Sequence, residues 1–144
     1  MKKETAKNIV DGSEMIFGRL ATNLAKRLLN GEEVHLINAE KIIIKGNPQV
    51  IFQRYLTKRG IKHKGTPERS PVWSKVPHML VKRMVRGMIP KENSRGKAAL
   101  GRLMVYTGNP KNLQMNLDTK EAKFDGRTRF ITISELCRKL GYSG

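Results

Sequence analysis

The sequence predicts an α/β fold in which a mostly parallel sheet carries helices on both faces. Short apolar runs rich in β-branched residues alternate along the chain with segments whose apolar residues recur every three to four positions. Parallel strands need long crossover connections, and helices usually provide them. A chain of 144 residues with 38% hydrophobic residues can bury one modest core. We therefore expect a single domain over residues 1–144.

Five apolar runs are predicted to be strands. The first ends at Gly12, and the third is closed by a turn between Gly46 and Pro48. The last run leads directly into the final predicted helix. The predicted strands are 8–11, 34–38, 42–44, 103–106 and 129–133.

The first predicted helix spans 18–30. Leu20, Leu24 and Leu28 recur on one face of this segment, which is the pattern of a helix packed on a core. Gly31 ends it, because glycine readily adopts the left-handed conformation that follows many helices.

A second helix is predicted to begin at Pro48, since proline suits the first turn of a helix. Its expected inner face consists of Val50, Ile51, Tyr55 and Leu56.

Three further helices are predicted towards the C-terminus, at 75–87, 94–100 and 134–140. Val81, Val85 and Met88 form one apolar stripe on the first of them. Ser94 and Ser134 are expected to cap the other two at their N-terminal ends.

Positive charge is concentrated in the middle of the chain. The sequence has 29 Lys and Arg against 12 Asp and Glu, a net charge of +17, and residues 54–102 alone contain 14 basic and 2 acidic residues. Positive charges at this density repel one another in a folded chain. They usually persist because a polyanion neutralises them. Residues 58–75, rich in charge, Gly and Pro, are predicted to form a basic loop. We expect a nucleic acid as the partner.

The glycines near the N-terminus do not form a nucleotide-binding motif. Gly12 and Gly18 are one residue too far apart for a phosphate-binding loop, and Arg19-Leu20 stands where Lys followed by Ser or Thr is required. We expect both glycines to permit a tight turn and close packing of helix on sheet. The sequence therefore predicts no nucleotide cofactor.

No catalytic or metal-binding set is predicted either. His35, His63 and His78 lie far apart and have no cysteine or paired acid at metal-ligand spacing. His35 is expected to be a hydrogen-bonded strand residue. Cys137, the sole cysteine, lies between leucines of the last predicted helix and is expected to be buried and structural. We expect no catalysis, no cofactor, no metal and no small-molecule substrate.

The sequence also predicts a cytoplasmic protein without membrane attachment. No apolar span is long enough to cross a bilayer, and residues 1–8 are charged and lack the apolar region of a secretory signal. A single thiol fits a reducing compartment.

The basic region supplies the candidate RNA contacts. Most are expected to bind phosphates, and Trp73 either stacks on a base or anchors the loop to the core, an alternative that the sequence leaves open. The candidates are Lys58, Arg59, Lys62, His63, Lys64, Arg69, Trp73, Lys82, Arg83, Arg86, Lys91, Arg95, Lys97 and Arg102.

Several short motifs, taken in order, resemble a known family. They are GRLAT at 18–22, VHLINAEKI at 34–42, VRGMIP at 85–90, RG at 95–96 and LMVYTG at 103–108. The set is similar to the L13 family of large-subunit ribosomal proteins, in its archaeal or eukaryotic form. The resemblance covers about 9–110, and the tail after Asn112 matches less clearly.

The resemblance implies a three-layer α/β/α domain around a four-stranded parallel sheet. It further implies a structural role on the large ribosomal subunit, against 23S-type rRNA and neighbouring ribosomal proteins, in support of assembly and translation. This chain has Ser70 where the family often has glycine, so the resemblance does not fix the path of the basic loop. The alternative is a free-standing α/β enzyme acting on a nucleotide or nucleic acid.

Overall fold

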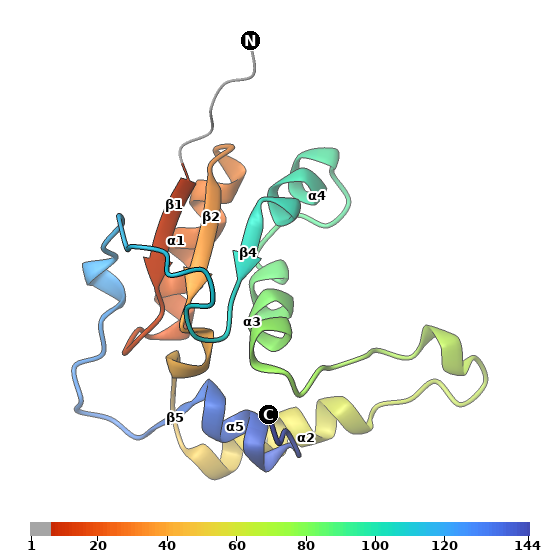
Figure 1. Cartoon of the computed structure of the whole chain (residues 1–144). Helices are drawn as coiled ribbons and strands as arrows, with labels where there is room; N and C mark the ends of the chain where they lie inside the picture. The colour runs from red at the N-terminus through yellow and green to blue at the C-terminus, as the bar shows by residue number, and fades with distance from the viewer. Residues whose placement is uncertain (1–6) are drawn as a thin grey trace.

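The computed structural model describes residues 7–144, and Figure 1 presents it as a body with one long projecting arm. The charged segment before Lys7, which the sequence analysis judged not to be a secretory signal, lies outside the described residues. Within the described part, no helix is both long and apolar enough to span a bilayer.

The centre of the fold is a parallel sheet, which among residues 7–144 has three strands in the order β1-β2-β4. These strands are β1 (Lys7–Asp11), β2 (Glu33–Ile37) and β4 (Leu103–Val105). The sheet therefore has one strand fewer than expected. Next to β1, a single isolated parallel bridge joins Val10 and Leu117.

The two remaining predicted strands form a separate ribbon. β3 (Ile43–Lys45) pairs with β5 (Phe130–Thr132) in antiparallel orientation. The alternation of strands and helices predicted one mostly parallel sheet, and for these two runs that prediction was wrong. The segment before β5 has no helix to return the chain parallel to β3, so β5 approaches it from the opposite direction.

Helix α1 (Phe17–Leu29) buries the predicted apolar face, with Leu20, Leu24 and Leu28 each at most 1% exposed. The turn before it explains one of the two N-terminal glycines. A Cβ on Gly12 would lie 2.8 Å from Ile42 Cγ1, so this position needs glycine for close packing. The expectation for Gly18 was wrong, because in the described structure a Cβ there would meet no atom within 4 Å.

Helix α2 (Pro48–Gly60) starts as predicted but packs differently. Asn47 caps it by accepting a hydrogen bond from the Gln49 amide. Among its apolar residues Ile51 and Tyr55 are buried, whereas Val50 is 54% exposed and Leu56 46% exposed. The helix contacts the narrow β3–β5 ribbon, so two buried side chains four positions apart are enough to cover the ribbon.

The other helices are α3 (Pro77–Arg86), α4 (Ser94–Gly101) and α5 (Ile133–Lys139). Helix α1 contacts both α3 and α4, which lie beside β4 in Figure 1. Val81 and Val85 are buried as predicted, but Met88 lies beyond the end of α3 and is 43% exposed. Short 3-10 turns occur at Ala39–Lys41, Pro67–Arg69 and Lys120–Ala122.

The predicted caps of α4 and α5 were placed one or two residues too late. Asn93 precedes α4, and Ser94 is already its first residue. Thr132 caps α5, its hydroxyl accepting a hydrogen bond from the Glu135 amide at 3.2 Å. One hydrophobic cluster runs from Val10 to Leu140 and includes residues of every helix.

Candidate nucleic-acid interface

The basic loop forms the projecting arm, which we define as residues 61–76 (Figure 1). Helix α2 extends to Gly60, so Lys58 and Arg59 lie on a helix and not in the predicted loop. The two irregular segments that run to and from the tip of the arm are joined by a hydrogen bond, in which the His63 amide donates to Ser70 Oγ at 3.0 Å. Ser70 thus joins the two sides of the arm through its hydroxyl, which a glycine at this position could not do.

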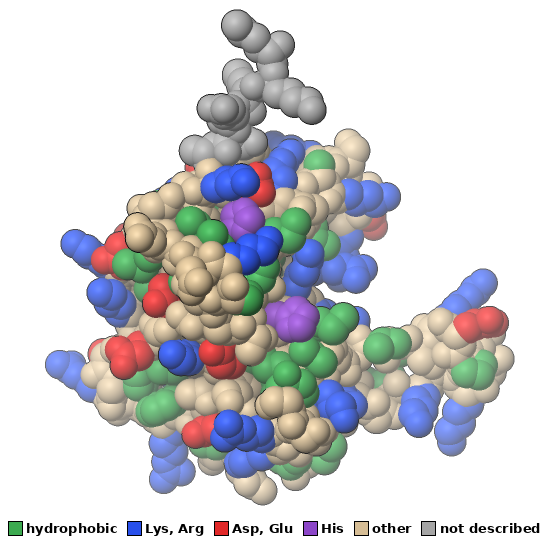
Figure 2. Space-filling model, in the orientation of Figure 1, with side chains coloured by type: hydrophobic (Ala, Val, Ile, Leu, Met, Phe, Trp, Pro, Cys, Tyr) green, Lys and Arg blue, Asp and Glu red, His purple; other side chains and the backbone are tan. Residues whose placement is uncertain are grey.

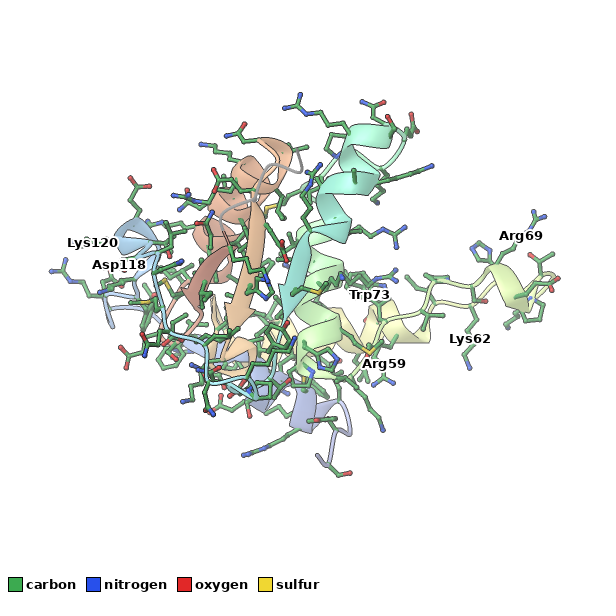
Figure 3. All side chains as sticks on the ribbon, turned by 45° about the horizontal axis from the view of Figure 1, so that its top comes forward. Arg59, Lys62, Arg69, Trp73, Asp118 and Lys120 are labelled. Atoms are coloured by element: carbon green, nitrogen blue, oxygen red, sulfur yellow. The ribbon has the colours of Figure 1, made fainter. Side chains whose placement is uncertain are left out.

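Three cations extend from the arm into solvent. Lys62, Lys64 and Arg69 are exposed, and Figure 3 shows Lys62 and Arg69 directed away from the body. The ion pairs within residues 7–144 are Arg27–Glu32, His35–Glu33 and Lys123–Asp118. None of them involves a predicted RNA contact, so in the described structure the positive charge of the arm is not neutralised by carboxylates.

Trp73 fastens the base of the arm to the body. Its half-buried ring packs against the core and meets Tyr55 edge-on, with ring centroids 5.9 Å apart. Two cations lie over the same ring, with Lys58 Nζ 4.6 Å and Arg83 Cζ 4.3 Å from its centroid. These contacts favour the anchoring role over base stacking, because the ring already has cationic and aromatic neighbours.

Helix α3 presents further cations beside the base of the arm. Lys82, Arg83 and Arg86 lie on its solvent side, while Leu80 and Val81 face the core. Arg83 also donates a hydrogen bond to the carbonyl of Val72. No protein partner is found for the Lys82 and Arg86 side chains among the described residues.

Several predicted RNA contacts instead hold helix ends. Arg102 Nη1 donates to Leu28 O at 2.9 Å, and Arg95 donates to Leu29 O through two nitrogens at 2.9 and 3.2 Å. Both carbonyls belong to the last turn of α1, which leaves its carbonyls without helical partners. In the same way Arg59 donates to Leu140 O at the end of α5, at 2.8 Å.

Replacing Arg102 with Gln is expected to lower the free energy of unfolding by about 1 kcal/mol, because a partly buried carbonyl loses its charged donor. Urea denaturation followed by circular dichroism measures this change. The matched control is Lys97→Gln on α4, the helix that ends just before Arg102, where an exposed side chain is removed. Equal stabilities of the two variants would show that the Leu28 bond contributes nothing.

The remaining predicted contacts are exposed: His63 on the arm, Lys91 in the loop before α4 and Lys97 in the middle of that helix. Lys75 was not among the predicted contacts, and its Nζ donates to Gly141 O at 3.0 Å. A basic face on α1, where Arg19 and Lys26 border one hollow, was not predicted either. Their spacing of seven residues places them on one helix face, a signal that the low net charge of residues 1–53 concealed.

Comparison with known proteins identifies the family. The sequence profile described as ribosomal protein L13 matches residues 6–112. A relative from Methanococcoides burtonii is 39% identical over 92% of this chain and 96% of its own length. The chain belongs to the ribosomal protein L13 family.

Other archaeal members of the L13 family are similarly close. The Archaeoglobus fulgidus protein is 38% identical over 94% of this chain and 88% of its own length. The Aeropyrum pernix protein is also 38% identical, over 98% and 94%. All three relatives are named large ribosomal subunit protein uL13. The resemblance seen in the sequence is thereby confirmed, and these names support a non-enzymatic protein over the enzyme alternative.

The L13 profile spans all fourteen predicted RNA contacts, from Lys58 to Arg102. It ends near Asn112, where the motif resemblance also faded. The tail beyond it is nevertheless part of the fold, since Ile131, Ile133 and Leu136 are at most 1% exposed.

The titratable groups of this L13 family member are bonded or dispersed. Within residues 7–144, no three His, Cys, Asp or Glu side chains could hold a metal ion together. His35 is hydrogen-bonded as predicted, with Glu33 Oε1 3.0 Å and the Tyr106 hydroxyl 3.3 Å from its ring nitrogens. Asp11 accepts from the Asn38 amide and the Ser13 backbone, and although burial opposes them, these bonds lower the pKa of its carboxyl.

Cys137 is fully buried, and burial raises the pKa of its thiol to about 11. A disulfide reagent at pH 8 is therefore expected to leave the folded protein unmodified and to react after unfolding in urea.

The raised pKa of Cys137 also makes stability depend on pH. The unfolded thiol ionises near a pKa of about 8.5, so the stability that comes from keeping the thiol neutral in the folded state is complete below that pH. The contribution is lost as pH rises towards 11, and Cys137→Ala should weaken this alkaline decline in urea titrations.

Proposed function

We propose that this chain is a structural constituent of the large ribosomal subunit, which binds and stabilises 23S-type rRNA and supports subunit assembly and translation. Family membership supports the ribosomal location. The observation that supports RNA binding is the unneutralised charge of the arm and α3. The cations there have no carboxylate partner within residues 7–144, and the sequence of 54–102 contains only two acidic residues.

The geometry divides the fourteen proposed RNA contacts by role. The first group can meet phosphates without giving up a protein contact, and it consists of Lys62, His63, Lys64, Arg69, Lys82, Arg86, Lys91 and Lys97. The second group also stabilises the fold, so its side chains reach RNA from fixed positions. It consists of Lys58, Arg59, Trp73, Arg83, Arg95 and Arg102. Phosphate contacts of both kinds position a protein on RNA.

The single hydrophobic cluster supports one domain over the whole chain, with the arm as an extension of it. The partners we propose are large-subunit rRNA and neighbouring ribosomal proteins, in the cytoplasm.

We further propose that the segment around Leu117 completes the four-stranded, three-layer arrangement that the family resemblance implies. Its support is the parallel bridge to Val10, together with the amides of Asn116 and Leu117, which both donate to Ile9 O at 3.2 Å. These contacts already follow the direction of a strand beside β1.

Sucrose-gradient fractionation of a lysate that contains the tagged chain tests the ribosomal proposal. The expected result is co-sedimentation with the large subunit, and release at molar salt, since phosphate contacts are screened. Recovery mainly in the light fractions at low salt would contradict the proposal.

A further inference from the structure

Beside the base of the arm lies a groove that combines apolar and cationic walls. We call it the α3–α4 groove, and its volume is about 330 Å³. Its apolar side chains come from three separate segments: Val72 from the arm, Met79 from α3 and Leu100 from α4. The cations Lys82, Arg83 and Arg86 line it as well. Figure 2 shows the molecule hollowed between the body and the arm on this side.

Two of the three apolar side chains of the groove are open to solvent, and the third, Leu100, packs partly against the core. Val72 is 74% exposed and Met79 54% exposed, although both stand among cations proposed to meet RNA. Phosphates cannot cover such side chains favourably. Removing apolar surface from water lowers the free energy only when another apolar surface covers it. A ligand that fits the whole groove must therefore present a flat or apolar part as well as negative charge.

One wall of the groove is fixed before any ligand arrives. The Arg83 guanidinium donates to the carbonyl of Val72 and lies 4.3 Å from the centroid of the Trp73 ring. Ser74 Oγ accepts from the Val76 amide at 3.1 Å, which holds the turn between the arm and α3. A guanidinium plane held in this way offers a surface on which a base can stack.

The charge around the groove selects an anion. Among the described residues that line it, three are cationic and none is acidic. The Lys82 and Arg86 side chains have no hydrogen-bond or ion-pair partner in the described part of the chain. Both side chains carry their charge at the end of a long flexible stem, so the charges can follow phosphates on either side of a bound group.

From these features we propose that the α3–α4 groove binds one unstacked nucleobase of the RNA, with Lys82 and Arg86 contacting the phosphates that flank it. Sequence-specific RNA recognition commonly uses bases splayed out of loops and bulges, because paired bases in A-form helices are poorly accessible. This inference rests on the proposed RNA-binding function and adds to it a site where a base, and not only the backbone, is bound.

The test compares single-stranded RNA tetranucleotides of each of the four bases with an abasic ribose–phosphate tetramer of equal charge. Binding to the full chain is measured by fluorescence anisotropy at low salt. At least one base-containing tetramer is expected to bind about tenfold more tightly than the abasic one, the scale of one stacked base. The affinities of the base-containing and abasic tetramers should fall in parallel as the salt concentration rises, because their phosphates are the same.

Met79→Gln locates the effect, and Met104→Gln is its control, because Met104 is 42% exposed on β4 and lies outside the groove. The Met79 variant should lose the preference for bases and keep its affinity for the abasic tetramer, while the Met104 variant keeps both. Equal binding of base-containing and abasic tetramers by the wild type would overturn the inference and leave RNA binding intact; a neighbouring protein would then cover the apolar groove. Absence of binding by every tetramer would overturn the inference and count against RNA binding itself.

Discussion

Reversing Lys62, Lys64 and Arg69 together to Glu is expected to lower affinity for large-subunit rRNA by about 500-fold near 0.1 M salt. Each cation that neutralises a phosphate of a duplex contributes about 0.9 to the slope of log affinity against log salt concentration. Loss of three contacts therefore lowers the slope by about 2.7, and the introduced carboxylates add repulsion. The folded state should not change, because these side chains extend into solvent.

Filter binding of purified protein to rRNA across a salt series measures both the affinity and the slope. The matched control is the triple reversal of Lys41, Lys45 and Lys139, which are exposed outside the arm and change the net charge equally. If both triple variants bind equally, long-range charge and not the arm determines binding. A wild-type slope in the arm variant would exclude the arm from the interface.

The arm is a better target for this experiment than α3. Arg83 holds the Val72 carbonyl and lies over Trp73, so its replacement would change the shape of the arm as well as the charge. Lys62 and Arg69 carry no such second role in the described structure, and an effect of their reversal can be assigned to RNA.

The sequence was sufficient where local periodicity determines structure. The leucines of α1 occur every fourth residue, and all three are buried, because this helix covers a wide hydrophobic surface. Helix α2 was predicted less well, since the number of its apolar residues that become buried depends on its partner, the narrow β3–β5 ribbon. Chain order also could not reveal that β5 pairs in antiparallel orientation, because strand pairing is decided by contacts far apart in sequence.

The same limit applies to the candidate interface. Composition identified the basic region, but it could not separate Lys97, which is exposed, from Arg95, which holds the end of α1. A guanidinium that meets a helix carbonyl and one that meets a phosphate use the same donors, so sequence alone gives them the same role. Only the position of α4 against α1 distinguishes them.

The placement of α4 against the loop that precedes it depends on a glycine, and Gly96→Ala is expected to destabilise the fold by about 3 kcal/mol, the upper range for overpacking a core. A Cβ at Gly96 would lie 1.8 Å from the carbonyl oxygen of Pro90 and 2.9 Å from its carbonyl carbon. Both atoms belong to the backbone, so no side chain can rotate away, and α4 must move as a unit. Urea denaturation measures the loss.

Gly101→Ala is the matched control, because it lies on the same helix and, within the described structure, its Cβ would meet nothing within 4 Å. This variant should gain about 0.5–1 kcal/mol, since alanine restricts the unfolded chain and favours helix. The opposite signs separate close packing from helix propensity, and similar effects of the two substitutions would contradict the packing argument. Displacement of α4 would also pull Arg95 from Leu29 O and shift Leu100 in the α3–α4 groove. Gly96→Ala should therefore weaken RNA binding even under conditions where the variant remains folded, whereas Gly101→Ala should not.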